Sequence, residues 1–192
     1  MSEKYMVGTV SHVSDYRMTF APREDINNSI SIQIHFNHIE ACKKAFDEKK
    51  LLKIKVNTKN DPLSLDKYSN LEMLIGPKIK PRLFELGLLK DGWYDGYGKG
   101  FDPVFLKVAE YSIWEILEQT DFPPCYIYPT PEGNVLLEWD GPNDGARAGE
   151  LEISNKNGIL SFYGMLYNGL EDIQTSEIRE MIDWLNKINW KA

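Results

Sequence analysis

Two carboxylates in the second half of the chain have the clearest spacing for chemistry. Glu138 and Asp140 stand two positions apart, so on a β-strand both side chains would lie on one face. Paired carboxylates can hold Mg²⁺ or act as an acid and a base, and Asp95 is a third candidate for such a site. A metal-dependent hydrolase is therefore one alternative. Nothing else in the sequence completes a reaction centre, so we assign no catalytic residue, no metal site and no cofactor.

A segment rich in glycine and aromatic residues precedes a helix signal at Asp102-Pro103. In Gly96-Tyr97-Gly98-Lys99-Gly100 the glycines would let backbone amides approach a phosphate, and the lysine would add positive charge. The segment lacks the Gly-Lys-Ser/Thr ending of a phosphate loop, and Asp102 would repel an anion, so we favour a flexible loop shaped by glycine. Its aromatic residues would suit a protein interface. The candidate binding residues are Trp93, Tyr94, Asp95, Tyr97, Lys99, Glu138 and Asp140.

Lysines are concentrated between positions 43 and 59. Seven lysines there face only Asp47 and Glu48, a balance of +5, and such a cluster could hold a nucleic-acid backbone. Lys53 and Lys55 alternate with apolar residues, which is also typical of the solvated side of an edge strand, and we favour that interpretation. The alternative is a nucleic-acid-binding protein that uses Lys43, Lys44, Lys53 and Lys55.

Histidine and cysteine give weaker indications. His35, His38 and Glu40 resemble a zinc-ligand set by type, but a strand and the following helix would separate the two histidines, so we expect no metal there. Cys42 lies on an apolar stripe and Cys125 has no nearby histidine, so neither is predicted to be a nucleophile. Two cysteines favour a reducing cytoplasm, and no apolar run is long enough to suggest a membrane span.

The charge of the chain is unevenly distributed. The 192 residues include 22 Lys+Arg and 29 Asp+Glu, a net charge of −7. Residues 1–80 hold 13 basic and 10 acidic side chains, a balance of +3, whereas residues 81–192 hold 9 and 19, a balance of −10. Two prolines and a glycine between positions 76 and 81 interrupt regular structure. We therefore expect a strand-rich N-terminal subdomain over residues 1–76 and an α+β C-terminal subdomain over residues 82–192.

The first subdomain is predicted to be a small curled sheet or barrel with one helix. Alternating apolar and polar residues indicate strands at 5–10, 16–20, 30–36, 52–56 and 71–75. Asn37 and Glu40 have the spacing of a capping box, which would start a helix. That helix is expected to bury Ile39, Cys42 and Phe46.

The second subdomain is predicted to be an antiparallel meander packed with two helices. Asp102 and Pro103 favour a helix start, and the apolar spacing continues to about Glu118. Thr175 is expected to cap a final helix. Strand patterns at 125–128, 135–139, 151–154 and 159–163 are separated by turn residues, with Trp139 expected in the core. The predicted fold class is α+β.

Two motifs in the second half resemble those of a family of uncharacterised bacterial proteins. The stretch from Gly92 to Gly98 is similar to Gly-Trp-x-Asp-Gly-x-Gly, and that from Pro129 to Trp139 is similar to Pro-Thr-Pro-x-Gly-x-Val-x-Leu-Glu-Trp. The resemblance implies a bacterial cytoplasmic protein. Some members look associated with toxin–antitoxin or phage-defence neighbourhoods, which favours an interaction protein. The resemblance implies no catalytic residue.

A non-enzymatic protein-interaction module is therefore our first hypothesis. The resemblance adds a finer form, an antitoxin-like or phage-defence-associated component. The acidic half predicts a basic protein partner, since opposite charge steers association. Nucleic-acid binding and metal-dependent hydrolysis remain alternatives, in that order, and no membrane partner is expected.

Overall fold

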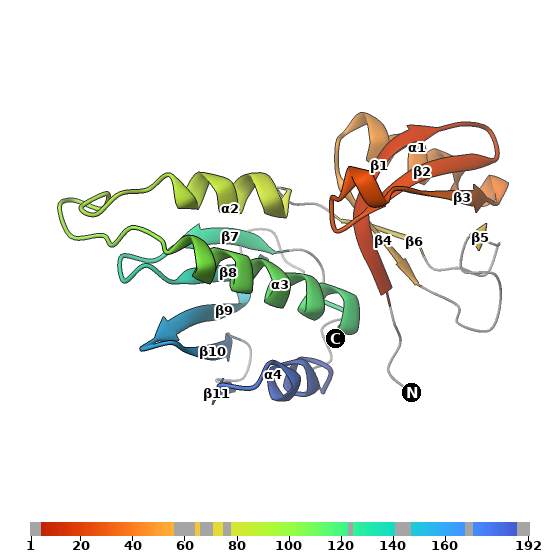
Figure 1. The fold of residues 1–192 in the computed structure, drawn as a ribbon. Coiled ribbons are helices and arrows are strands. Elements are labelled where there is room, and N and C mark those ends of the chain that lie inside the picture. Colours follow the sequence, from red (N-terminus) through yellow and green to blue (C-terminus); the bar gives the residue numbers. More distant parts are fainter. Residues whose placement is uncertain are drawn as a thin grey trace. The chain divides into compact units, whose positions relative to one another are not determined.

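The computed structural model divides the chain into two compact units. The structure describes residues 5–55, 64–65, 71–74, 78–122, 125–140, 147–167 and 171–187. The first unit comprises Met1–Lys78 together with Leu117–Thr120, and the second comprises Ile79–Ile116 together with Asp121–Ala192. Each unit contains one β-sheet with helices (Figure 1), so the predicted α+β class is confirmed.

An open six-stranded sheet forms the first unit. Its strands are β1 (Tyr5–Val13), β2 (Arg17–Pro22), β3 (Ile30–Ile34), β4 (Leu51–Lys55), β5 (Ser64–Leu65) and β6 (Leu71–Leu74). They lie in the order β5-β3-β2-β1-β4-β6, and all pairs are antiparallel except β3 with β5. Short 3₁₀ helices η1 (Ile26–Asn28) and η2 (Phe36–His38) flank β3. β5 and β6 are the two edge strands and do not pair with each other, so the sheet is open. Of the two predicted forms, a curled sheet or a barrel, the barrel is therefore excluded.

Helix α1 (Ile39–Asp47) packs on β1 and supplies part of the core of this unit. Cys42 and Ala45 from the helix are buried with alternate apolar residues of the sheet. The predicted capping box does not form, because His38 occupies the N-cap position and makes no side-chain cap bond. Instead, Nδ1 of His35 accepts a hydrogen bond from the backbone N–H of Asn37 and caps η2. Phe46, expected in the core, is 42% exposed.

Lys53 on β4 lies inside the first unit rather than at its surface. β4 pairs with both β1 and β6, so it is not the edge strand that we expected. The side chain is 0% exposed, and its Nζ donates a hydrogen bond to the backbone carbonyl of Thr120 at 2.5 Å. The same Nζ lies 4.3 Å from the centroid of the Tyr5 ring. Because Thr120 follows helix α3 (Pro103–Gln119), the cation is at the carbonyl end of a helix, where positive charge is favoured. The expectation of a solvated Lys53 is wrong.

A five-stranded antiparallel sheet forms the centre of the second unit. Its strands are β7 (Tyr126–Pro129), β8 (Val135–Asp140), β9 (Arg147–Lys156), β10 (Ile159–Leu166) and β11 (Asp172–Thr175), in the order β11-β10-β9-β8-β7. The predicted meander is therefore confirmed, and β11 extends it by one strand. Asn157 and Gly158 both have positive φ, at 57° and 83°, which is the conformation of a tight hairpin turn between β9 and β10.

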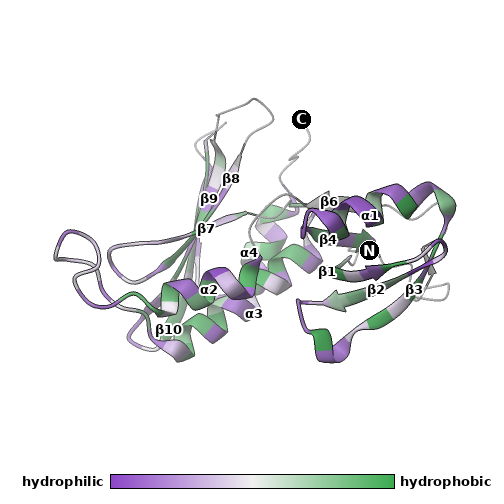
Figure 2. Ribbon diagram, turned by 90° about the horizontal axis from the view of Figure 1, so that it is seen from above, coloured by the Kyte–Doolittle hydropathy of each residue, from purple (hydrophilic) through white to green (hydrophobic). Residues whose placement is uncertain are grey.

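The helices of this unit cover one face of its sheet, as Figure 2 shows. Alternate residues of the strands are buried on that face, among them Leu137, Trp139 and Phe162. The expected core position of Trp139 is thus confirmed, and its ring meets Phe122 edge to face at a centroid distance of 5.2 Å. Gly164 has no side chain where the Trp184 ring of α4 (Ile178–Leu185) lies against the strand.

The described part of the second unit has a third helix that the sequence analysis missed. Helix α2 (Ile79–Gly87) begins where we expected only an interruption. Pro81 is its third residue, and a proline is tolerated in the first turn because the N–H groups there have no partner within the helix. Ile79, Leu83 and Leu86 form its buried side. Helical spacing of apolar residues was the signal, but Pro77 before the helix and Pro81 in its first turn obscured it.

The predicted start of α3 is confirmed, whereas α4 begins differently. The Asp102 carboxylate accepts a hydrogen bond from the Val104 N–H at 2.9 Å. In α4 the N-cap is Glu177, and the predicted capping residue Thr175 belongs to β11. The Thr175 hydroxyl nevertheless accepts from the Glu177 N–H and donates to the Glu180 carboxylate, so it supports the helix start from outside.

Candidate binding face

The first candidate region, the loop between α2 and α3, is a compact structure held by its own hydrogen bonds. The Gly92 N–H donates to the Gly98 carbonyl, and the Trp93 indole N–H donates to the Lys99 carbonyl at 3.0 Å. Gly98 is required here, since a Cβ at that position would lie 2.5 Å from the Trp93 indole nitrogen. Gly98 therefore shapes a compact loop, whereas we had expected a flexible one.

The aromatic and acidic residues of this loop do not converge into a pocket. Tyr94 contacts the Trp93 ring edge to face at 5.6 Å, and Tyr97 is 79% exposed. Asp95 is exposed, with a positive φ of 46°. The loop is attached to the β7–β8 turn through the Lys99 N–H, which donates to the Pro131 carbonyl. These residues present a local surface at one end of the second unit.

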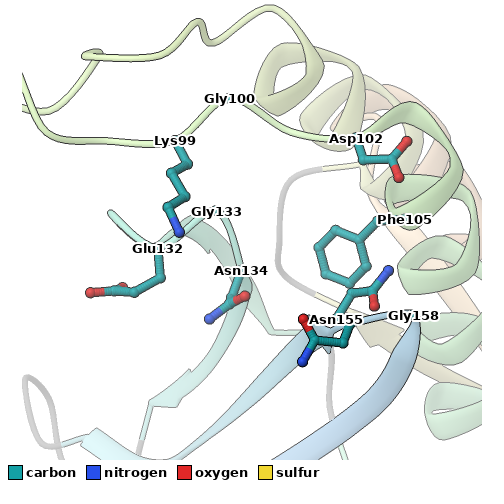
Figure 3. Close-up of a pocket in the computed structure, with 10 residues that line it drawn as sticks. Lys99, Gly100, Asp102, Phe105, Glu132, Gly133, Asn134, Asn155 and Gly158 are labelled. Atoms are coloured by element: carbon teal, nitrogen blue, oxygen red, sulfur yellow. The ribbon is translucent and has the colours of Figure 1, made fainter.

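A polar cavity of about 280 Å³ lies where this loop meets the β7–β8 and β9–β10 turns. Figure 3 shows the Lys99 side chain reaching toward the β7–β8 turn, with the amides of Asn134 and Asn155 nearby. Asp102 and Glu132 also line the cavity, so both signs of charge are present. Because the Asp102 carboxylate already accepts the Val104 N–H at the start of α3, the geometry gives an anion site no support.

Two carboxylates of the candidate set, Glu138 and Asp140, belong to β8. Glu138 pairs across the sheet with Tyr126 on β7 and with Glu150 on β9. The register of β8 with β9 shifts after Trp139, where Ala148 is an extra residue on β9 and Asp140 pairs with Arg147. The Asp140 side chain lies outside the described residues. Glu150, which we did not select, is the carboxylate that the sheet sets directly opposite Glu138.

The face of the second sheet that points away from the helices carries tyrosine and glutamate side chains. In the register, one row across the sheet runs Tyr126, Glu138, Glu150, Met165, and the next runs Tyr128, Leu136, Glu152, Tyr163. None of the described helices lies on this face (Figure 2). We call it the tyrosine–glutamate face and define it by Tyr126, Tyr128, Leu136, Glu138, Glu150, Glu152, Tyr163, Met165 and Tyr167.

Hydrogen bonds fix two of the glutamates on the tyrosine–glutamate face. The Tyr167 hydroxyl donates to the Glu150 carboxylate at 2.6 Å, and the Asn134 amide donates to the Glu152 carboxylate at 2.8 Å. A carboxylate can accept about four hydrogen bonds, so both groups keep acceptor capacity. Glu138 and Glu150 stand directly opposite each other, and like charges in this position destabilise a sheet.

The sequence contained a signal for this face that we did not use. Tyr126 and Tyr128 alternate around the buried Ile127, and Glu150 and Glu152 alternate around the buried Leu151. Period-two alternation places each pair on one face of its strand. Only the register of the sheet shows that the two pairs share the same face.

The helix side of the second unit has a surface of different chemistry. A groove of about 370 Å³ between α2 and α3 is lined mainly by apolar side chains. Phe84 and Leu88 line it and are 69% and 60% exposed. Lys80 and Lys107 stand at the groove together with Glu110, and Lys80 lies 4.0 Å from the Glu110 carboxylate.

The four lysines of the nucleic-acid alternative do not form one exposed surface. Lys53 is buried, as described above, and the partly buried Lys55 follows it on β4. Lys43 and Lys44 lie on α1, each with its Nζ 3.9 Å from a carboxylate oxygen, of Glu40 and Glu48 respectively. The Lys50 side chain also pairs with Glu48 and lowers the pKa of that carboxyl. Acidic neighbours thus offset much of the positive charge on α1.

Neither cysteine has the environment of a reactive thiol. Burial raises the pKa of Cys42 to about 11 and that of Cys125 to about 12. Both thiols therefore stay protonated near neutral pH, and a protonated thiol is a weak nucleophile. Among the described residues, no group of three His, Cys, Asp or Glu side chains has an arrangement that could hold a metal ion.

Comparisons of the chain with protein-family models, with curated proteins and with solved structures found no match. The resemblance drawn from the two motifs therefore stays a prediction. In the part of the chain that the structure describes, none of the helices has both the length and the apolar character needed to cross a bilayer. Function must be argued from the surfaces themselves.

Proposed function

We propose that this protein is a protein-interaction module that binds a basic segment of a partner protein on the tyrosine–glutamate face. The observation that carries the proposal is the composition of that face, which combines three glutamates with four tyrosines on a sheet surface away from the helices. Tyrosine is enriched in protein interfaces because its ring supplies contact area and its hydroxyl supplies a hydrogen bond.

Charge supports a basic partner in particular. The second half of the chain carries a balance of −10, so its field attracts a positively charged protein before contact. On the face itself, the opposed carboxylates of Glu138 and Glu150 would both be stabilised by one cation placed between them. Phosphate groups would be repelled from the same surface, so this face gives the nucleic-acid alternative no support.

The resemblance adds a finer form of the proposal. In that form the protein works in a bacterial cytoplasm, as an antitoxin-like or phage-defence-associated component that captures a basic protein. The exposed sheet face fits this form because it offers contact area and charge without a reacting group. The metal-dependent hydrolase alternative gains no support from the described carboxylates, since they form no metal-binding group.

A binding titration with a defined basic probe tests the proposal. The probe is a ten-residue peptide of alternating lysine and serine, measured by calorimetry at low and at physiological salt. We expect binding that weakens with salt, since exposed charge pairs are screened. In the double variant Glu138→Gln and Glu150→Gln, the affinity should fall by at least about tenfold, because the carboxylates next to the cation are lost.

A matched variant separates the face from the general negative charge. Asp47→Asn with Asp183→Asn removes the same two charges from exposed positions on α1 and α4. This control should change affinity by less than about twofold, because charges that do not line the face act only through the screened long-range field. Equal losses in the two double variants, or no binding of the basic peptide at all, would contradict the proposal.

A further inference from the structure

The tyrosine–glutamate face also has features that distinguish between the two basic side chains. Resting on the proposed function, we propose that the partner segment presents arginine to this face, with a guanidinium group stacked against Tyr126 and Tyr128 and paired with Glu138. The inference names the chemistry of the partner, and it depends on the geometry of the β7 tyrosines and on the register between β7, β8 and β9.

The two β7 tyrosines form a wedge that suits a flat cation. Their ring centroids lie 6.4 Å apart with 30° between the ring planes, and the two side chains are 38% and 39% exposed. A planar group in contact with both rings needs two separations of about 3.5 Å, or about 7 Å in all. A small rotation of two exposed rings supplies the difference. A cation placed there lies within about 6 Å of both centroids, which is the range of a cation–π contact.

The register places a carboxylate at the side of this wedge. Glu138 stands directly opposite Tyr126 in the β7–β8 pair, and Glu150 follows opposite Glu138 in the β8–β9 pair. Side chains directly opposite each other on antiparallel strands have Cβ atoms about 4.5–5.5 Å apart. A guanidinium on the tyrosine rings is therefore next to the Glu138 carboxylate.

This combination favours arginine over lysine. The guanidinium is planar, stacks on aromatic rings and donates two parallel hydrogen bonds to a carboxylate. The lysine ammonium is a compact, strongly hydrated charge that can pair with Glu138 but has no flat surface for the tyrosines. A face that offered only carboxylates would bind arginine and lysine side chains with similar affinity. The preference for arginine therefore depends on the tyrosine pair.

The spacing of the two rows indicates the form of the partner segment. Tyr126 and Tyr128 are two residues apart, as are Glu150 and Glu152, so the rows lie about 6.8 Å apart along the strands. Alternate residues of an extended peptide have the same separation. An extended segment can therefore place one guanidinium against Tyr126 and Tyr128 and its next alternate side chain about 6.8 Å further along the strand direction.

The test compares three ten-residue peptides in which serine alternates with arginine, with lysine or with glutamate. Calorimetry with the full chain at low salt should give about tenfold tighter binding of the arginine peptide than of the lysine peptide, and no binding of the glutamate peptide. In the double variant Tyr126→Leu and Tyr128→Leu, the arginine peptide should bind only as tightly as the lysine peptide. The lysine peptide should lose less affinity than the arginine peptide, because its ammonium makes a cation–π contact but does not stack on the rings.

A control variant and the possible outcomes make the test decisive. Tyr16→Leu with Tyr111→Leu removes two exposed tyrosines that lie outside the face and should leave the arginine preference intact. Circular dichroism of each variant confirms that its fold is retained. Equal binding of the arginine and lysine peptides overturns this inference and leaves the proposed function standing. Binding of neither peptide overturns both.

Discussion

Strands β4 and β8 each alternate charged with apolar residues, yet the two sheets use these charges in opposite ways. On β4 the Lys53 side chain is fully buried and donates to the Thr120 carbonyl. On β8 the Glu138 side chain is partly exposed on a face without helices. Residues 51–54 of β4 are all buried, so both sides of that strand are covered, whereas the described helices lie on only one face of the second sheet. The alternation of charged and apolar residues identifies which side chains share a face of the sheet. Whether that face is exposed to solvent depends on which other elements pack against it.

The largest expected effect comes from removing the buried charge of β4. Lys53→Ala deletes a hydrogen-bond donor to the Thr120 carbonyl and leaves an empty volume inside the first unit. We expect the free energy of unfolding to fall by about 3 kcal/mol. Urea denaturation followed by far-ultraviolet circular dichroism measures it, because all five tryptophans belong to the second unit. A loss below about 1 kcal/mol would show that the Lys53 side chain is exposed to solvent, as the Glu138 side chain on β8 is in part.

A second comparison uses the two buried thiols, one in each unit. Their pKa values are raised from 9.0 to about 11 for Cys42 and to about 12 for Cys125. The folded state therefore holds these protons above pH 9 while the unfolded state releases them. Each thiol makes its full contribution to the free energy of unfolding below pH 9. Between pH 9 and the pKa of the folded state, the free energy of unfolding should fall by about 1.4 kcal/mol per pH unit for each thiol.

Denaturant titrations between pH 8 and pH 11 check the effect of the thiols. The slope of the free energy of unfolding against pH should be smaller in Cys42→Ala and in Cys125→Ala than in the unmodified chain. In each variant the difference should equal the contribution of one thiol. An unchanged slope in either variant would mean that the corresponding thiol is accessible to water in the folded state.

A third substitution separates the loop between α2 and α3 from the tyrosine–glutamate face. Gly98→Ala places a methyl group on the Trp93 indole and should destabilise the second unit by about 2 kcal/mol through overpacking. Binding of the basic peptide should not change at temperatures where the variant stays folded, because β8 does not take part in this contact. Thermal unfolding and calorimetry provide the two readouts. Loss of peptide binding would indicate that the binding site includes the loop between α2 and α3, whose residues the sequence analysis selected.

The smallest effect concerns the opposed carboxylates of β8 and β9. Glu138→Gln removes a like-charge pair and should raise the free energy of unfolding by a few tenths of a kcal/mol. The same change should weaken binding of the basic peptide, so stability and binding move in opposite directions. Asp183→Asn on α4 is the matched control and should affect neither. A loss of stability in Glu138→Gln would mean that the carboxylate supports the sheet.

Local patterns in the sequence were sufficient to predict most elements of the fold. Alternation located the main strands, the Asp102-Pro103 pair located α3, and Asn157-Gly158 located a hairpin. These features depend on neighbours in the chain, so they can be derived without knowing the tertiary structure. Helix α2 was missed because Pro81 suggests a break, although a proline in a first turn costs little.

The candidate face was less accessible to prediction because it depends on register. Glu138 was selected for its spacing from Asp140, whose side chain lies outside the described residues. The partners that the sheet gives Glu138 are Tyr126 and Glu150, each about twelve residues away in the chain. A pairing of this kind follows from strand order, which no local pattern in a single sequence specifies.

The last residue of β7 affects how safely the protein can display its tyrosines. β7 is an edge strand, and an exposed edge offers unpaired backbone groups that can recruit strands from other molecules. Pro129 has no N–H to donate, and β7 is only four residues long. Pairing of β7 with a strand of another molecule is therefore disfavoured. The protein can expose Tyr126 and Tyr128 on this strand with less risk of aggregation at high concentration.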